Sequence, residues 1–185
     1  AMERLERNRA AQVIDRQRER IERPFSGAWA GAADGDVTMT VFTDYACTFC
    51  RASLADIDRL LREDRNLKVV FRELPILSPD SEPAARLALA AARRGRYLPM
   101  HRALFESGSP DADARRDAAV NLDVANDSAA LGDAAITREL EGNVALARDL
   151  GIDGTPSWVI GDRMLTGAVG YDQLRAAISA ARAGE

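Results

Sequence analysis

Two segments in the first half of the chain have the pattern of β-strands, and a helical pattern lies between them. Residues 37–42 alternate hydrophobic side chains with threonines, and 67–74 contains the hydrophobic run Val69-Val70-Phe71. Between these segments, leucines and an isoleucine recur at helical spacing over 54–61. A strand, a helix and a second strand within about 38 residues predict a βαβ unit.

Residues 80–151 have helical patterns throughout. An alanine-rich helix begins at Ser81-Glu82-Pro83, and two further helices are predicted before position 122. A longer helix ends before Gly151 and is indicated by the spacing of Ile136, Leu140, Val144 and Ala147. We therefore expect an inserted helical domain over 80–151.

The last part of the chain returns to strands. Two short hydrophobic runs, 157–160 and 163–166, are separated by Gly161-Asp162, which is a signal for a two-residue hairpin. An amphipathic helix then closes the chain. With the βαβ unit, this pattern predicts one α/β domain made of 36–79 and 152–185.

The first 24 residues are highly charged and predict one helix. Its hydrophobic strip is thin and consists of Ala10, Ile14, Gln17 and Ile21. Such a strip is too narrow to dock well on a core, which leaves two interpretations: a solvated or frayed helix, and an oligomerisation arm. Residues 25–35 are rich in Gly, Ala and Asp and are expected to be a linker.

Composition narrows the functional classes. A chain of 185 residues suits one domain with an appendage, and its net charge of −4 gives no electrostatic case for nucleic acid or an anionic membrane. No hydrophobic stretch approaches the ~20 residues that span a bilayer. The charged start, Ala1-Met2-Glu3-Arg4, is not a signal peptide.

The chain has two cysteines, Cys47 and Cys50, between the first strand and the following helix. Unpaired N–H groups and the helix dipole favour a thiolate at a helix N-terminus. We therefore expect Cys47 to be an exposed attacking thiol and Cys50 to lie inward and resolve the mixed disulfide. An incidental pair and half of a metal site are the alternatives. The sole histidine, His101, is far along the chain, so a four-ligand metal site would need two protomers.

Two motifs resemble the DsbA-type branch of the thioredoxin fold, and most closely its Com1-like and suppressor-of-copper-sensitivity C (ScsC) members. They are Phe42-Thr43-Asp44-Tyr45-Ala46-Cys47-Thr48-Phe49-Cys50 and Gly154-Thr155-Pro156-Ser157-Trp158-Val159-Ile160-Gly161, with supporting stretches between them. The resemblance spans about 36–181. It implies an α/β thioredoxin fold with a helical insertion and an N-terminal helical extension. It also implies a cis Pro156 that faces the thiols and leaves the Thr155 backbone to pair with a substrate strand.

The resemblance further implies a protein disulfide oxidoreductase or isomerase, without a cofactor, in the periplasm or another extracytoplasmic compartment, with a signal peptide that precedes this sequence. Its partners would be protein substrates and a redox protein that resets the site. Thr48 replaces the common proline and Phe49 replaces the histidine of strong oxidants, which predicts a milder, isomerase- or reductase-leaning pair. Thr155 in place of valine points the same way.

Two alternatives to this function stay open. One is a copper- or zinc-binding module linked to copper tolerance, with Cys47 and Cys50 as ligands. The other is a cytosolic thioredoxin-like reductant.

Three further residues are weaker candidates. Asp44 and Glu73 could lie near the thiols and move protons; the alternative is an exposed or paired structural acid. His101 is expected to be a packing residue.

Overall fold

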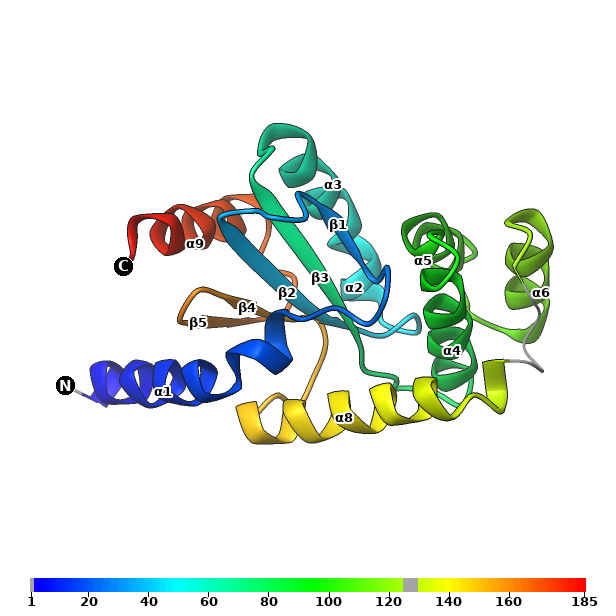
Figure 1. Ribbon diagram of the computed structural model, residues 1–185, viewed down its shortest axis with the longest axis horizontal. Coiled ribbons are helices and arrows are strands. Elements are labelled where there is room, and N and C mark those ends of the chain that lie inside the picture. The colour runs from blue at the N-terminus through cyan, green and yellow to red at the C-terminus, as the bar shows by residue number, and fades with distance from the viewer. Residues whose placement is uncertain (1, 125–129) are drawn as a thin grey trace.

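The computed structural model describes residues 2–124 and 130–185, so position 1 of the predicted segment 1–24 and positions 125–129 of the predicted insert fall outside it. At its centre is a five-stranded sheet with the order β1-β3-β2-β4-β5 (Figure 1). The strands are β1 (Trp29–Gly31), β2 (Val37–Thr43), β3 (Leu67–Glu73), β4 (Ser157–Ile160) and β5 (Arg163–Thr166). The helices are α1 (Met2–Glu22), α2 (Thr48–Ala52), α3 (Leu54–Glu63), α4 (Ser81–Ala92), α5 (Tyr97–Glu106), α6 (Ala112–Asn121), α8 (Ala134–Leu150) and α9 (Tyr171–Ala183).

The predicted βαβ unit is confirmed. β2 and β3 pair in parallel from Val37↔Leu67 to Thr43↔Glu73, and nearly every residue of both strands is buried. The predicted hairpin is also present, because β4 and β5 pair antiparallel around a turn in which Gly161 has a φ of 57°. The carboxyl ends of β2 and β3 lie side by side, because the two strands are parallel. The segment with the cysteines follows β2, which is the middle strand of the sheet.

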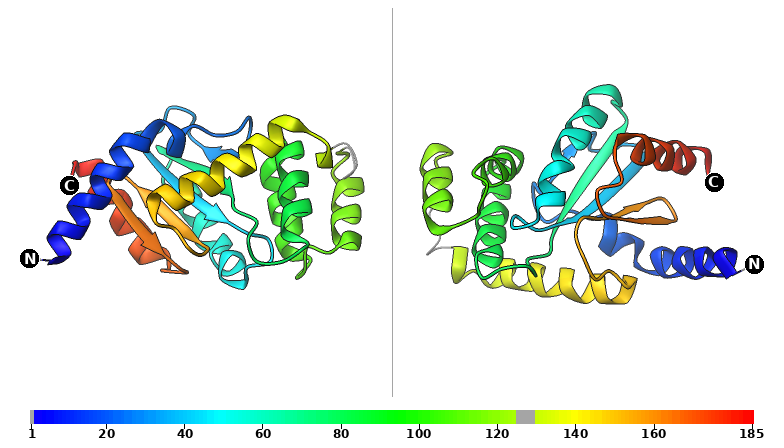
Figure 2. Two further views of the ribbon diagram at one scale, coloured as in Figure 1. Left: turned by 90° about the horizontal axis from the view of Figure 1, so that it is seen from below. Right: turned by 180° about the vertical axis from the view of Figure 1, so that it is seen from behind.

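Helices cover both faces of the sheet. α1 and α8 lie on one side, and α3 and α9 lie on the other (Figures 1 and 2). α4, α5 and α6 stand beyond the carboxyl ends of β2 and β3 (Figure 1). Their buried hydrophobic residues belong to one cluster with most of the buried hydrophobic residues of β2 and β3. The fold is therefore the expected thioredoxin-like α/β arrangement, while a division into two separate domains stays a prediction.

The expectation of a linker at 25–35 is wrong. This segment contains β1, which pairs antiparallel with β3 from Trp29↔Val70 to Gly31↔Lys68. Ala28 and Ala30 are buried in the core beneath it. The strand has only three residues, so its sequence is too short to show alternation, and its partner strand supplies the hydrogen bonds that define it.

The N-terminal helix docks more firmly than its thin hydrophobic strip predicts. Ile14 and Ile21 are at most 1% exposed and pack in one cluster with Phe42 of β2 and Leu150 of α8. The first turns of α1 project away from the body (Figure 1). Two isoleucines in the second half of the helix are buried in this way, because the sheet and α8 form a matching hydrophobic surface.

Candidate functional site

Cys47 lies at the N-terminus of α2, immediately after the central strand β2. Its backbone is extended, and its sulfur accepts a hydrogen bond from the Cys50 amide at 3.1 Å, as the N-cap of the helix. The Cys47 thiol donates to the carbonyl oxygen of Thr155 at 3.4 Å. Residues 108 positions apart in the sequence therefore meet at one sulfur atom. The Thr155–Pro156 peptide bond is cis.

Cys50 lies in the first turn of α2 and is 4% exposed. Burial, together with the hydrogen bond to Cys47, raises the pKa of its thiol to about 12. Cys50 therefore keeps its proton at neutral pH. The inward position expected for this residue agrees with the structure.

The prediction that Cys47 is an exposed thiol is wrong in degree, because Cys47 is only 5% exposed. Its access is a small pocket lined by Tyr45, Ala46, Cys47, Thr48, Arg51, Phe105 and Gly108. Phe105 and Gly108 come from the end of α5 and the loop that follows. Sequence reasoning missed this cover because the inserted helices reach the thiol only in the folded chain.

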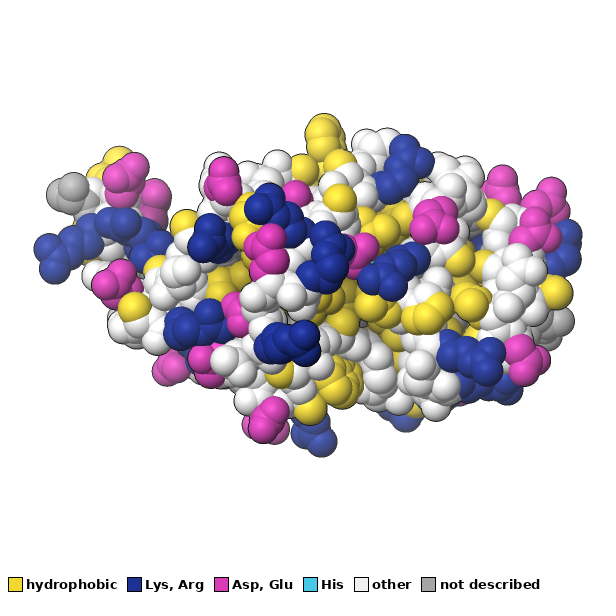
Figure 3. Space-filling view, turned by 90° about the horizontal axis from the view of Figure 1, so that it is seen from above, with side chains coloured by type: hydrophobic (Ala, Val, Ile, Leu, Met, Phe, Trp, Pro, Cys, Tyr) yellow, Lys and Arg dark blue, Asp and Glu magenta, His cyan; other side chains and the backbone are white. Residues whose placement is uncertain are grey.

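Hydrophobic side chains are exposed close to the cysteines. Phe49, between the two thiols, is 64% exposed, and Ile76 and Leu77 in the loop after β3 are about half exposed. The Ile76 and Leu77 amides both donate to Asp44 Oδ2, at 2.8 and 2.9 Å, which holds this loop against the turn before Cys47. Figure 3, which looks onto the side of α3 and α9, shows hydrophobic side chains gathered in the middle of that face between charged ones. We call Phe49, Ile76 and Leu77 the apolar rim.

Asp44 is a structural carboxylate, which is the alternative left open for it. It is 1% exposed, and its two oxygens accept four hydrogen bonds. The donors are the amides of Ala46, Ile76 and Leu77 and the hydroxyl of Ser81. Both oxygens are therefore engaged in fixing two loops and the start of α4.

Glu73 lies at the end of β3 inside a closed polar cluster. Its Oε1 accepts from the hydroxyls of Tyr97 and Tyr45, the latter at 2.9 Å, and its Oε2 is buried without a partner among the described residues. His101 Nδ1 lies 2.8 Å from the Tyr45 hydroxyl and 3.3 Å from that of Tyr97. Burial raises the pKa of Glu73 to about 8 and lowers the pKa of His101 to about 3. His101 is therefore a hydrogen-bonding partner as well as the expected packing residue. The spacing of Tyr97 and His101, four residues apart on one helix, was the available signal.

These two groups predict a stability maximum in mildly acidic solution. Glu73 binds its proton more tightly in the folded state, so its contribution to stability falls as the pH rises from 4.5 to about 8. His101 binds a proton less tightly in the folded state, so its contribution falls as the pH drops from 6.5 to about 3. The opposite slopes cancel between pH 4.5 and 6.5. Outside this plateau we expect the free energy of unfolding to fall by up to ~1.4 kcal/mol per pH unit for each group.

Urea unfolding over a pH series measures this profile. The Glu73→Gln variant cannot ionise at position 73, so its free energy of unfolding should stay level from about pH 6.5 to 8. A decline of the same size in this variant would assign the alkaline slope to another group.

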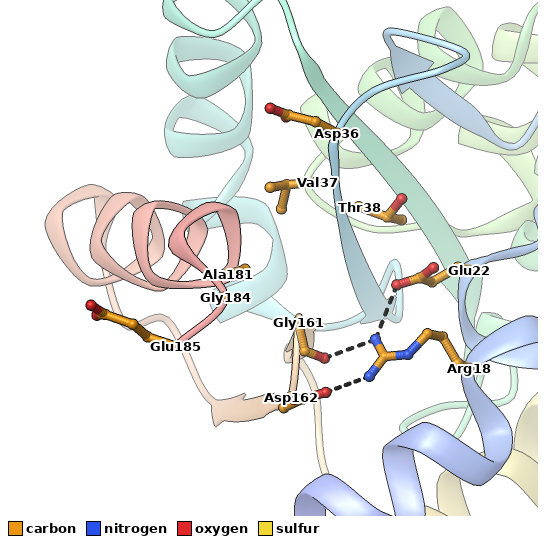
Figure 4. A pocket seen from close by; sticks show the side chains of 10 residues that line it. All are labelled: Arg18, Glu22, Asp36, Val37, Thr38, Gly161, Asp162, Ala181, Gly184 and Glu185. Atoms are coloured by element: carbon orange, nitrogen blue, oxygen red, sulfur yellow. Dashed lines mark hydrogen bonds and ion pairs between the residues drawn. The ribbon is translucent and has the colours of Figure 1, made fainter.

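The other pockets lie away from the thiols. In the one shown in Figure 4, Arg18 of α1 bonds the Gly161 carbonyl oxygen at 3.2 Å and pairs with Asp162, in the turn between β4 and β5. Val37, at the start of β2, lines it, whereas Cys47 follows the other end of that strand. The Arg18 contacts join α1 to the hairpin. Over residues 2–124 and 130–185, no three His, Cys, Asp or Glu side chains are grouped to hold a metal ion.

Three solved structures that are similar to this chain are a thioredoxin-like oxidoreductase, a thiol-disulfide exchange protein and the catalytic domain of ScsC. A thioredoxin-like oxidoreductase from Silicibacter pomeroyi is 34% identical, with a TM-score of 0.85, over 90% of this chain and 98% of its own. The thiol-disulfide exchange protein alpha-DsbA2 from Wolbachia pipientis is 27% identical, with a TM-score of 0.86, over 95% and 97%. The catalytic domain of Proteus mirabilis ScsC is 26% identical, with a TM-score of 0.84, over 94% and 98%.

Curated relatives are longer proteins. The Na⁺/H⁺ antiporter NhaA 3 of Salinispora tropica is 27% identical over 156 residues, which are 82% of this chain and 24% of the antiporter. The chain thus spans about a quarter of the length of the curated relatives it matches. Among the described helices, none is both long enough and apolar enough to cross a membrane.

The family model for a DSBA-like thioredoxin domain matches residues 38–179, from β2 to α9. This match covers the sheet apart from β1 and the first residue of β2, and it includes the inserted helices and both halves of the site around Cys47. Together with the parallel β2–β3 pair and the cysteine pair at the start of α2, it shows that the chain belongs to the family of DSBA-like thioredoxin domains, with the fold of the thiol-disulfide oxidoreductases.

Proposed function

We propose that this protein exchanges disulfides with protein substrates through Cys47 and Cys50. The observation that carries the proposal is the Cys47 sulfur at the N-cap of α2, in contact with the Cys50 amide and the Thr155 carbonyl. This position presents one sulfur to a pocket and keeps the other inside. A substrate disulfide would be attacked at one sulfur by the Cys47 thiolate, and the second substrate sulfur would leave as a thiol.

Cys50 would then resolve the mixed disulfide. Its sulfur, after losing its proton, forms the bond with Cys47 Sγ and releases the first substrate sulfur as a thiol. The reaction leaves the substrate reduced by two electrons and the Cys47–Cys50 pair oxidised. In the reverse direction a substrate dithiol is oxidised, and without net electron transfer the substrate disulfides are rearranged. In this proposal the substrate backbone binds at Thr155 and Pro156, and hydrophobic substrate side chains contact the apolar rim.

We infer an isomerase or reductase preference. The described hydrogen-bond partners of the Cys47 sulfur are the Cys50 amide and the Thr155 carbonyl, so neither Thr48 nor Phe49 adds a bond that stabilises the reduced form. A reduced form with little stabilisation makes a pair a weaker oxidant. We also infer an extracytoplasmic compartment, because protein disulfides form and persist there. A redox partner would reset the pair after each exchange.

Equilibration of the pair with glutathione, followed by oxidase, reductase and isomerase assays, tests this function. We expect a reduction potential more negative than about −120 mV, the value typical of strong oxidants, and activity on a protein with scrambled disulfides. A potential at or above that value with oxidase activity alone would overturn the preference. A stable copper or zinc complex of the reduced protein without any disulfide exchange would overturn the function and favour the metal-binding alternative.

We further propose that the projecting part of α1 joins copies of the chain. Met2 and Leu5 are 78% and 59% exposed, and a groove between this part and β5 includes Met164 and Leu165. Deletion of residues 1–9 should lower the sedimenting mass, because it removes the proposed contact between copies. It should preserve the thermal midpoint of unfolding, because it leaves Ile14 and Ile21 in place. A chain that sediments as a monomer before the deletion would exclude this role.

A further inference from the structure

The buried cluster of Glu73, Tyr45, Tyr97 and His101 has more acceptors than protons. Each side chain is at most 4% exposed, so water does not supply hydrogen bonds. Each tyrosine has one hydroxyl proton, but each hydroxyl lies within bonding distance of both Glu73 Oε1 and His101 Nδ1. The direction of every bond is therefore fixed by where the remaining protons are.

With Glu73 ionised, both tyrosines donate to Oε1. Their hydroxyl protons are then used, so the contact of Tyr45 with Nδ1 requires a proton on that ring nitrogen. The low pKa of His101 keeps its ring neutral, so Nε2 carries none. Glu73 Oε1, both tyrosine hydroxyls and Nδ1 all have partners in this arrangement, while Oε2 is left without one among the described residues.

With Glu73 protonated, the order reverses. A proton on Oε2 would be a buried donor without an acceptor, because this oxygen has no partner in the described structure. The proton therefore sits on Oε1 and is donated to a tyrosine oxygen, whose own proton turns to Nδ1. His101 then carries its single proton on Nε2. One proton is gained by Glu73, and the imidazole proton moves from one ring nitrogen to the other.

Tyr45 connects this cluster to the thiol. It lies two residues before Cys47 and lines the pocket over that sulfur. Its ring packs against Phe105, which lines the same pocket, with centroids 4.8 Å apart. Two hydrogen bonds hold the turn that leads from Tyr45 to Cys47. Asp44 O accepts from the Cys47 amide at 3.0 Å, and Asp44 Oδ1 accepts from the Ala46 amide at 2.9 Å.

We propose that Glu73 is a positioning residue for the redox pair. The protonation of Glu73 reverses the hydrogen bonds to His101, and it is coupled through Tyr45 to the redox state of the pair. This inference rests on the proposed function, because it takes Cys47 and Cys50 as the reacting pair. The charged groups that face the cluster are Asp44 beside the turn, Glu139 on α8 and Arg102 on α5. Asp44 and Glu139 raise the pKa of Glu73 by repulsion in both redox states. The reduced pair can add the negative charge of a thiolate, so Glu73 should ionise less readily in the reduced protein than in the oxidised one. By reciprocity, ionisation of Glu73 disfavours the reduced pair.

NMR titration of the His101 ring nitrogens tests this in both redox states of the protein. We expect the proton to move from Nε2 to Nδ1 as the pH rises, with a midpoint near that of Glu73. The midpoint should be higher in the reduced protein by about half a pH unit, a threefold change in proton affinity and the effect of one modest hydrogen bond. The Glu73→Gln variant should show no such movement.

Two tyrosine variants separate positioning from simple packing. Tyr45→Phe should bring the midpoints of the two redox states closer together, because it removes the hydrogen-bonded connection between the pocket and Glu73. Tyr97→Phe, which leaves the bond between Tyr45 and Glu73 intact, should keep them as far apart as in the wild-type protein. Equal midpoints in the wild-type protein, or no ring-nitrogen switch between about pH 6 and 10, would overturn the inference even if both variants failed to fold. Disulfide exchange by a protein without Cys47 would instead overturn the proposed function and leave the His101 titration interpretable.

Discussion

Replacing Cys47 with serine is expected to abolish disulfide exchange in both directions. The serine hydroxyl can occupy the N-cap of α2 and accept from the Cys50 amide, so the helix should keep its start. It cannot form the sulfur–sulfur bond on which the reaction depends, and Cys50 does not line the pocket through which Cys47 is reached. We expect a loss of about a thousandfold or more in insulin reduction and in rearrangement of a scrambled protein.

Cys50→Ser is the matched control for this prediction. It leaves the attacking thiol in place and removes the one that resolves the mixed disulfide. We therefore expect it to accumulate a covalent complex with a substrate protein, detectable on a non-reducing gel and released by a reductant. Full activity of Cys47→Ser, or equal trapping by both variants, would reverse or remove the roles assigned to the two cysteines.

The parts of the fold that depend on local pattern could be predicted from the sequence. β2 and β3 are buried strands with continuous hydrophobic runs, and Gly161-Asp162 fixes the position of the hairpin. β1 could not be predicted, because three residues contain no period and only their pairing with β3 makes them a strand. The docking of α1 could not be predicted for a related reason. The two isoleucines in the sequence do not show which surface of α8 and β2 they pack against.

The two acids of the site show where sequence reasoning ends. Asp44 and Glu73 both follow a hydrophobic strand pattern and were equal candidates for moving protons. In the fold, Asp44 accepts four hydrogen bonds, from donors up to 37 positions away in the sequence. Glu73 accepts two hydrogen bonds from hydroxyl groups, and no described ion pair involves it. That difference depends on which loops meet the turn before Cys47. It decides which acid is held as a structural carboxylate and which has its pKa raised to about 8.

Arg72, next to Glu73 on β3, holds the end of α1 on the sheet. Its side chain is 5% exposed and pairs with Glu139 of α8 at 2.9 Å. Its other nitrogens donate to the carbonyl oxygens of Arg20 and Ile21, in the last turn of the helix, and of Arg23, just after it. The Ile21 carbonyl also accepts from the Thr40 hydroxyl. A cation at the C-terminal end of a helix also complements its dipole. One guanidinium group therefore joins α1, β3 and α8.

Replacing Arg72 with glutamine should destabilise the protein by about 3 kcal/mol, because it leaves the part-buried Glu139 carboxylate and the carbonyls of Arg20 and Arg23 without this donor. The matched control is Arg59→Gln, which breaks the exposed pair with Glu63 and should cost less than about 1 kcal/mol. Urea unfolding measures both changes. Hydrogen exchange should locate the damage, with faster exchange in residues 13–22 and unchanged protection in α3. A loss of stability without faster exchange in α1 would mean that Arg72 supports the sheet instead of the helix. In that case Ile14, Ile21 and the Arg18 contacts with the hairpin would hold α1 in place without Arg72.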